Sequence, residues 1–150
     1  MSLQDRKKLT AWLIVFMILL FLSSTNGIGA QITNVRKIYE PYFSQYPSLK
    51  NAVLIYQCVL FGAACIGFYT VWVLYQRLPG TLFVAQRGLV IFTTLRLASV
   101  WIFYQFAGGL GTGRASVRAN MVSSVAVILT GAVWYLYLAR SKRVREIFSA

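Results

Sequence analysis

Four long apolar runs divide this sequence of 150 residues, and they constrain its fold more than any other feature. They cover residues 9–28, 52–75, 82–106 and 119–139. About 20 mainly apolar residues are enough for an α-helix to cross the hydrocarbon core of a bilayer. Lipid offers no hydrogen-bond partner to backbone amides, so each run must close its own backbone bonds as a helix. We therefore predict an all-α membrane protein, in which residues 1–150 form one up-down bundle of four transmembrane helices.

The charge balance indicates which molecules surround these runs. Only 12% of the residues are charged, whereas about 25% is usual in soluble domains. The chain has fifteen Lys and Arg residues and only three acids, which gives a net charge of +12. The basic residues lie mainly beside the apolar runs, where they meet the head groups of an anionic leaflet. We therefore predict membrane lipids as partners and no nucleic acid.

The placement of Lys and Arg predicts the orientation of the chain, because cytoplasmic segments carry more of them. With the N-terminus inside, the cytoplasmic side holds eight such residues outside the runs and the opposite side holds five. This bias predicts that both chain ends are cytoplasmic. The eight are Arg6, Lys7, Lys8, Arg77, Arg140, Lys142, Arg143 and Arg145, and the five are Arg36, Lys37, Lys50, Arg114 and Arg118.

The first apolar run has a second interpretation as a secretory signal peptide. Three basic residues at positions 6–8 precede it, and Gly29 and Ala30 follow it, as in such a peptide. Cleavage after Ala30 would leave three spans. We expect the run to be retained as the first of four helices.

The connections between the runs predict which helices are neighbours. Only residues 76–81 separate the second run from the third, so these helices should be antiparallel neighbours. About 20 residues separate the first run from the second. Pro41 is suited to the start of a short helix, which would rest Tyr42, Phe43 and Tyr46 on the membrane surface. The alternative is an irregular loop whose aromatic side chains lean on the bundle.

The residue types that most catalytic and metal sites need are scarce. The sequence contains no histidine, which is the commonest general base and metal ligand. Cys58 and Cys65 lie about 10 Å apart along one helix, too far for a disulfide. We interpret both as small buried apolar residues. We therefore predict a protein that is not an enzyme and has no catalytic residue, no metal site and no cofactor.

Arg96 is the most unusual residue of the apolar runs, because it lies near the middle of the third one. A charge at that depth costs at least about 2.5 kcal/mol, so such residues often mark functional sites. No acid lies within any run, since the three acids of the chain are Asp5, Glu40 and Glu146. The arginine must therefore find carbonyls, hydroxyls, amides, water, an anionic lipid or another subunit.

Polar residues in the outer halves of the other runs offer Arg96 a pocket. Side chains lean towards the N-terminus of their own helix, however, which points Arg96 somewhat away from these residues. The alternative is a structural arginine that snorkels or binds backbone carbonyls and only fixes helix packing. We predict a lipid- or ligand-binding site at Arg96, Gln57, Ser123 and Ser124, with Ser23, Ser24 and Asn26 nearby.

Small residues in the second run predict a close contact between helices. Ala63 and Gly67 form a small-xxx-small pattern, with Gly62 and Ala64 beside it. Such a pattern lets two helix backbones approach closely. The contact lies either within the bundle, which is the ordinary case, or between two copies of the chain.

Basic residues also cluster in the C-terminal tail, which we expect to continue the last helix out of the membrane. Each Lys or Arg close to an anionic leaflet gains about 1 kcal/mol. The tail is therefore a topology anchor or, as the sharper alternative, a docking site for a partner. The basic residues are Arg140, Lys142, Arg143 and Arg145.

The end of the chain carries an ordered motif of aromatic, basic and apolar residues, which consists of Trp134, Tyr137, Ser141, Lys142, Arg143, Val144 and Phe148. Together with Trp12-Leu13-Ile14 and Pro79, this motif resembles a bacterial domain-of-unknown-function family of small four-helix inner-membrane proteins. Ile147 stands where that family often has threonine, and the specific motif covers only the last fifteen residues. The resemblance implies a multi-pass protein of the bacterial inner membrane and implies no activity.

Three functions fit these observations. The first is a non-enzymatic accessory subunit or interaction partner of a membrane complex. The second is a protein that binds or translocates an anionic lipid or lipid carrier. The third is an immunity protein against a pore-forming toxin. A membrane-bound glutathione- or leukotriene-type transferase is disfavoured, because the arginine and asparagine motif of its second helix has no counterpart here.

Overall fold

The computed structural model describes residues 11–76, 78–109 and 113–148. Side chains are described in these ranges except at 26–36, 38, 103, 104, 106–109, 113–121, 123 and 143. All regular structure in the described residues is helical, which confirms the all-α prediction. The elements are α1 (Ala11–Tyr39), the 3₁₀ turn η2 (Glu40–Tyr42), α2 (Pro47–Gln76), α3 (Thr81–Gly109), α4 (Gly113–Arg140) and α5 (Lys142–Phe148).

Each long helix coincides with one of the predicted apolar runs and extends beyond its C-terminal end. Among the described residues, two stretches are long and apolar enough to cross a membrane, Pro47–Gln76 and Thr81–Ile102. The apolar parts of the other two long helices are shorter, Ala11–Thr25 and Ser124–Arg140. Length and composition therefore support two spans directly.

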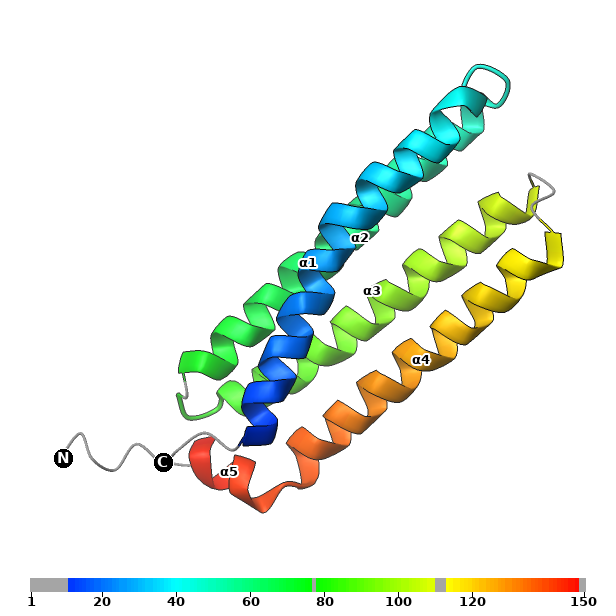
Figure 1. The fold of residues 1–150 in the computed structure, drawn as a ribbon. Coiled ribbons are helices and arrows are strands. Elements are labelled where there is room, and N and C mark those ends of the chain that lie inside the picture. Colours follow the sequence, from blue (N-terminus) through cyan, green and yellow to red (C-terminus); the bar gives the residue numbers. More distant parts are fainter. Residues whose placement is uncertain (1–10, 77, 110–112, 149–150) are drawn as a thin grey trace.

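The four long helices run up and down, and α2 and α3 form the central pair (Figure 1). Gly80 makes their short turn possible with a φ of 81°, which is unfavourable for other residues. α1 packs on α2, and α4 packs on α3. The start of α1 and the short α5 lie at one end of the bundle, here called the α5 end (Figure 1). The end that carries η2 is called the tip.

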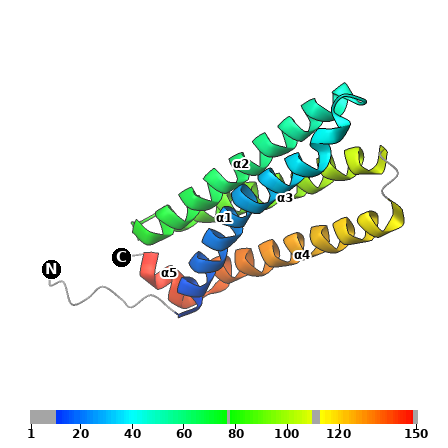
Figure 2. The ribbon, with the colours of Figure 1, turned by 45° about the horizontal axis from the view of Figure 1, so that its top comes forward.

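α1 crosses the bundle at an angle instead of running parallel to α4. It begins beside the last turns of α4 and finishes beside the first turns of α2 (Figure 2). As a result, α1 and α4 diverge towards the tip. This divergence creates the site described below.

The connection between α1 and α2 is much shorter than the sequence predicts. The helix continues to Tyr39, so only residues 40–46 connect it to α2. Pro41 lies within the single 3₁₀ turn η2, and Pro47 begins α2, where proline's missing N–H costs nothing. Tyr42 and Tyr46 are exposed, whereas Phe43 packs on a small cluster around Tyr39 and Tyr56. The connection therefore has a feature of each predicted alternative, a short helical turn and an aromatic side chain that packs on the bundle.

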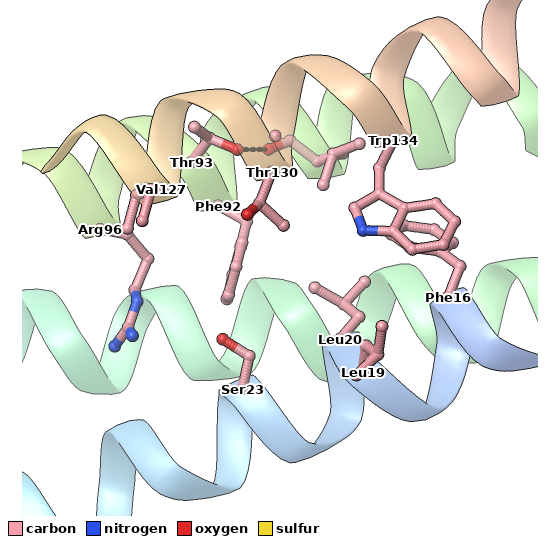
Figure 3. A pocket seen from close by; sticks show the side chains of 13 residues that line it. Phe16, Leu19, Leu20, Ser23, Phe92, Thr93, Arg96, Val127, Thr130 and Trp134 are labelled. Carbon is pink, nitrogen blue, oxygen red and sulfur yellow. Dashed lines mark hydrogen bonds between the residues drawn. The ribbon is translucent and has the colours of Figure 1, made fainter. Parts of the chain in front are cut away.

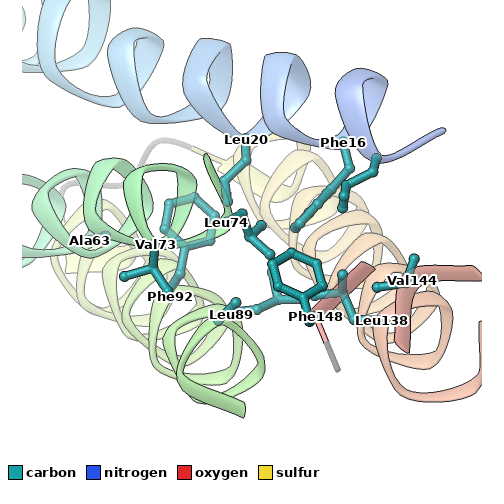
Figure 4. Close-up of a cluster of buried hydrophobic side chains, with 12 residues drawn as sticks. Phe16, Leu20, Ala63, Val73, Leu74, Leu89, Phe92, Leu138, Val144 and Phe148 are labelled. Carbon is teal, nitrogen blue, oxygen red and sulfur yellow. The ribbon is translucent and has the colours of Figure 1, made fainter. Parts of the chain in front are cut away.

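The main core lies towards the α5 end (Figure 4). α1 contributes Leu13, Phe16 and Leu20 to it, all at most 4% exposed. Removal of residues 1–30 as a signal peptide would delete this part of the core. The remaining buried residues of the cluster are Ala63, Val73, Leu74, Ala85, Leu89, Phe92, Leu138, Val144 and Phe148.

A glycine faces a hydroxyl side chain at each of the three long-helix interfaces. A Cβ atom on any of these glycines would overlap the hydroxyl oxygen opposite it. Each hydroxyl donates a hydrogen bond of 2.8 Å to the carbonyl four residues earlier, so it is held in place. Small residues that let backbones approach are typical of helix packing in membranes. The pairs are Gly67 with Ser24 (α2–α1), Gly88 with Thr70 (α3–α2) and Gly131 with Thr93 (α4–α3).

Three of the four small residues predicted to pack in α2, Ala63, Ala64 and Gly67, therefore lie inside the bundle. Ala63 is 1% exposed and belongs to the core, and Gly67 lies against Ser24 and Phe92. Gly62 is different, because a Cβ atom there would meet no atom within 4 Å. The prediction of a close packing contact at Gly62 was wrong, since this glycine lies on the outward side of the pattern.

The C-terminal tail does not continue α4, contrary to the sequence-based expectation. Helix α4 ends at Arg140, and the backbone N–H of Val144 donates a 3.4 Å hydrogen bond to the Ser141 hydroxyl, which caps the start of α5. Val144 and Phe148 are 0% and 4% exposed and close the α5 end of the core. The tail turns back because its apolar residues at i, i+3 and i+4 form one face that the core covers.

The outward sides of the long helices are strongly apolar. Exposed residues include Trp12, Trp72 and Trp101, each more than half exposed. Cys58 and Cys65 are also exposed and are free thiols, so their interpretation as buried residues was wrong. They lie on the outer side of α2, while its opposite side packs on α1 and α3. Many further Leu, Ile, Val and Phe side chains of α1–α4 are exposed in the same way.

Candidate functional site

A crevice of about 200 Å³ lies where α1 and α4 diverge over α3 (Figure 3). Its size is comparable to that of an engineered apolar cavity of about 150 Å³ that binds benzene. Most lining side chains are apolar, and the polar groups among them are one guanidinium, three hydroxyls and the indole N–H of Trp134. The lining residues are Phe16, Leu19, Leu20, Ser23, Leu89, Phe92, Thr93, Arg96, Ala126, Val127, Thr130, Gly131 and Trp134.

Aromatic rings close the crevice on the side of the α5 end. Phe16 of α1 and Trp134 of α4 approach to 4.6 Å between ring centroids, and Figure 3 shows the two rings together. Tyr137 adds an edge contact to Trp134 at 5.8 Å. Phe148 and Val144 of α5 belong to the core cluster that this aromatic pair joins. The crevice therefore has a closed, apolar end.

Arg96 occupies the opposite end of the crevice. It lies about 22 Å along α3 from Thr81 and about 20 Å from Gly109. Its side chain runs from α3 towards α1 and α2, and the Ser23 hydroxyl points into the same space (Figure 3). The Ser99 hydroxyl donates a 2.7 Å hydrogen bond to the backbone carbonyl of Arg96. Arg96 as a whole is half-buried.

The electrostatic partner of Arg96 is the buried Tyr56 of α2. The Tyr56 backbone lies about 7 Å closer to the tip than that of Arg96, when both are counted from the α2–α3 turn. Tyr56 thus lies on the tip side of Arg96, on the neighbouring helix α2.

Neither carboxylate in the described part of the chain is placed to neutralise Arg96. Glu40 lies in η2 at the tip, Glu146 lies in α5 at the other end, and Asp5 falls outside the described residues. A neutral tyrosine hydroxyl accepts a hydrogen bond but carries no charge. The site therefore offers one uncompensated positive charge to a ligand.

The structure places the sequence-predicted site residues in different surroundings. Gln57 and Ser124 are half-buried and lie outside the crevice lining. Ser24 faces Gly67 instead of Arg96. The side chains of Ser123 and Asn26 lie outside the described residues. Of the predicted pocket residues whose side chains are described, Ser23 alone joins Arg96 in the crevice.

Several residues in the crevice, and Tyr56 beside Arg96, were not found by sequence reasoning. Tyr56 was overlooked because a tyrosine near the end of an apolar run is typical of an interface anchor. Thr93 and Thr130 carry no charge, and nothing in the sequence distinguishes them from other threonines of the apolar runs. Trp134 was recognised only as part of the tail motif, whereas its half-buried side chain lines the crevice. The spacing of Thr93 and Arg96 by three residues does place both on one face of α3.

Arg87, the other arginine of α3, has a different environment. It is exposed, and its guanidinium carbon lies 4.1 Å from the centroid of the Phe83 ring, a cation–π contact. It lies about 9 Å along α3 from Thr81, near the α5 end. Arg87 thus offers a matched control for any test of Arg96.

The basic residues of the tail form an exposed group next to the buried face of α5. Arg140, Lys142 and Arg145 are exposed, and the side chain of Arg143 lies outside the described residues. The Arg145 guanidinium donates a 3.3 Å hydrogen bond to the Arg140 carbonyl at the end of α4. This contact joins the two helices across Ser141.

Comparison with models of known protein families, with curated proteins and with solved structures gives no match to this chain. The resemblance of the tail to a bacterial inner-membrane family therefore stays a prediction. A function can therefore be inferred only from the residues of the crevice and their geometry.

Proposed function

We propose that this chain is a four-span membrane protein, with both ends cytoplasmic, that binds an anionic amphiphile in its crevice without catalysis. Three features support the four spans. Two helices meet the length and composition of a span, apolar side chains cover the outward sides of all four long helices, and glycines line their interfaces. The start of α1 and α5 lie at the same end, as a cytoplasmic location of both requires. The bacterial inner membrane is the location that the tail motif suggests.

The observation that carries the binding proposal is a single arginine at one end of an apolar crevice. An ionisable residue inside a membrane is costly unless it is paired. Among the described residues, Arg96 has a tyrosine beside it but no carboxylate. A phosphate or carboxylate head group supplies the missing charge, and a guanidinium binds both well. The apolar lining suits an attached acyl chain.

An accessory-subunit function has one observation in its favour. α4 packs on α3 and α5, and its exposed residues include Val125, Leu129 and Val133. A helix of a partner protein would cover these exposed apolar residues of α4. The bound mass, a polypeptide or a lipid, distinguishes the two proposals.

We expect native mass spectrometry of gently solubilised protein to show one retained anionic lipid per chain. The expected spectrum contains the bare chain and one adduct of phospholipid mass, with zwitterionic lipids depleted relative to the membrane extract. Activation in the gas phase should release this lipid last. The same material from an Arg87→Gln variant should give the same adduct.

A stoichiometric polypeptide without any lipid adduct would support the accessory-subunit function instead. Bare protein alone, or adducts that follow the lipid composition of the membrane, would overturn the binding proposal.

A further inference from the structure

The crevice has a direction, because its two ends differ in chemistry. Arg96 and Ser23 lie at the end nearer the tip, and Phe16 and Trp134 lie at the end nearer α5. Along α4, Trp134 is only about 9 Å from Arg140 at the α5 end of the bundle. An amphiphile fits this polarity in one orientation only, with its charged head at Arg96 and its chain towards Trp134.

The shape of the crevice favours the same orientation. Phe16 and Trp134 bring α1 and α4 together at 4.6 Å, and the buried residues of α5 lie in the same cluster. Towards the tip, α1 and α4 diverge (Figure 2). An acyl chain therefore enters from the tip side or sideways between α1 and α4, and it stops at the aromatic pair. A volume of about 200 Å³ holds part of one chain, while the rest stays in the bilayer.

We propose that the bound amphiphile belongs to the leaflet on the tip side of the membrane, with its head at Arg96 and its chain pointing to Trp134. This inference rests on the proposed binding function. Lipids of that leaflet already point their chains towards the α5 end, so they enter without turning over. A lipid of the α5-side leaflet would bring its chain to Arg96 and its head to the aromatic pair. With both chain ends cytoplasmic, the selected leaflet is the outer one.

Tryptophan quenching by brominated lipids tests this orientation, because bromine quenches only a ring that it contacts. One variant keeps Trp134 and replaces the exposed Trp12, Trp72 and Trp101 with phenylalanine. A second variant keeps only Trp72, which is 58% exposed and about 6 Å along α2 from Gln76. The two rings lie at similar depths near the α5 end. Trp134 faces the crevice, whereas Trp72 faces bulk lipid.

The probe is phosphatidylglycerol, brominated either near the carbonyl or near the methyl end of one chain, at low mole fraction in phosphatidylcholine vesicles. We expect the methyl-end bromines to quench Trp134 at least twice as strongly as the carbonyl-end bromines. Trp72 should show the reverse order, because α5-side lipids present their carbonyl ends to it. Arg96→Gln should remove the excess quenching of Trp134 and leave Trp72 unchanged.

Stronger quenching of Trp134 by carbonyl-end bromines, still dependent on Arg96, would overturn the orientation and keep the binding site. Quenching of Trp134 that Arg96→Gln does not alter, with either probe, would overturn the binding function itself.

Discussion

Replacing Arg96 with glutamine should weaken binding of phosphatidylglycerol by roughly 10- to 100-fold. Hydrogen bonds to a charged partner contribute about 1.5–3 kcal/mol, and 1.4 kcal/mol corresponds to a factor of ten in affinity. Glutamine keeps a polar side chain in the crevice but removes the charge that attracts the head group. The measurement is a titration of delipidated protein with phosphatidylglycerol in neutral detergent, followed by native mass spectrometry.

Two matched variants separate the site from general attraction to anionic lipid. Arg87→Gln removes the same charge from the exposed position on α3 and should leave the affinity within a factor of two. Arg96→Lys keeps the charge but not the planar guanidinium, so it should retain an intermediate affinity. Equal losses for the Arg87 and Arg96 variants would mean that lipid binds a diffuse basic surface and not the crevice.

Replacing Gly67 with leucine should destabilise the protein by about 3 kcal/mol, the upper part of the usual cost of overpacking. Even a Cβ atom there would overlap the Ser24 hydroxyl and lie 3.1 Å from the Phe92 ring. The substitution therefore forces α1 away from α2. The measurement is thermal unfolding in detergent, where a loss of this size lowers the midpoint by about 6–12 °C.

Gly62→Leu is the control, because it places the same side chain one turn away, where no atom lies within 4 Å. It should leave the unfolding midpoint almost unchanged. A smaller substitution tests the specific contact. Gly67→Ala should be less destabilising when Ser24→Ala removes the overlapping hydroxyl, which gives a measurable coupling energy. Similar midpoints for Gly67→Leu and Gly62→Leu would show that α1 and α2 do not meet at Gly67.

The helices were predictable from the sequence, whereas their ends were not. A long apolar run must be helical, because its backbone groups find hydrogen-bond partners only within the helix. The run ends where the side chains become polar, whereas the helix can continue. α1 continues to Tyr39 through polar residues that carry no helix-stopping proline. The fold-back of α5 depends on Ser141 and on a small apolar face of three residues. The basic residues of the tail dominate its sequence, so this apolar face was not recognised.

The site was predictable only at Arg96, whose charge stands out in an apolar run. The composition of the pocket depends on how far α1 and α4 diverge, which is a property of helix packing. The glycine–hydroxyl contacts set that packing, and only Gly67 had been recognised. Without the crossing of α1, Trp134 and Thr130 could not be brought together with Arg96. Gln57 and Ser124 had the right depth, but they lie outside the crevice lining.

The most direct test of the account is a solid-state NMR measurement of the dipolar coupling between the Arg96 guanidinium carbon and lipid phosphorus. The protein carries ¹³C-labelled arginine in bilayers that contain phosphatidylglycerol, and the spectrum of Arg96→Lys identifies the Arg96 signal by difference. We predict that phosphorus dephases this signal as strongly as it dephases arginines at the membrane surface. An Arg96 signal that phosphorus leaves unaffected, while surface arginines respond, would contradict the binding of a phospholipid head group in the crevice.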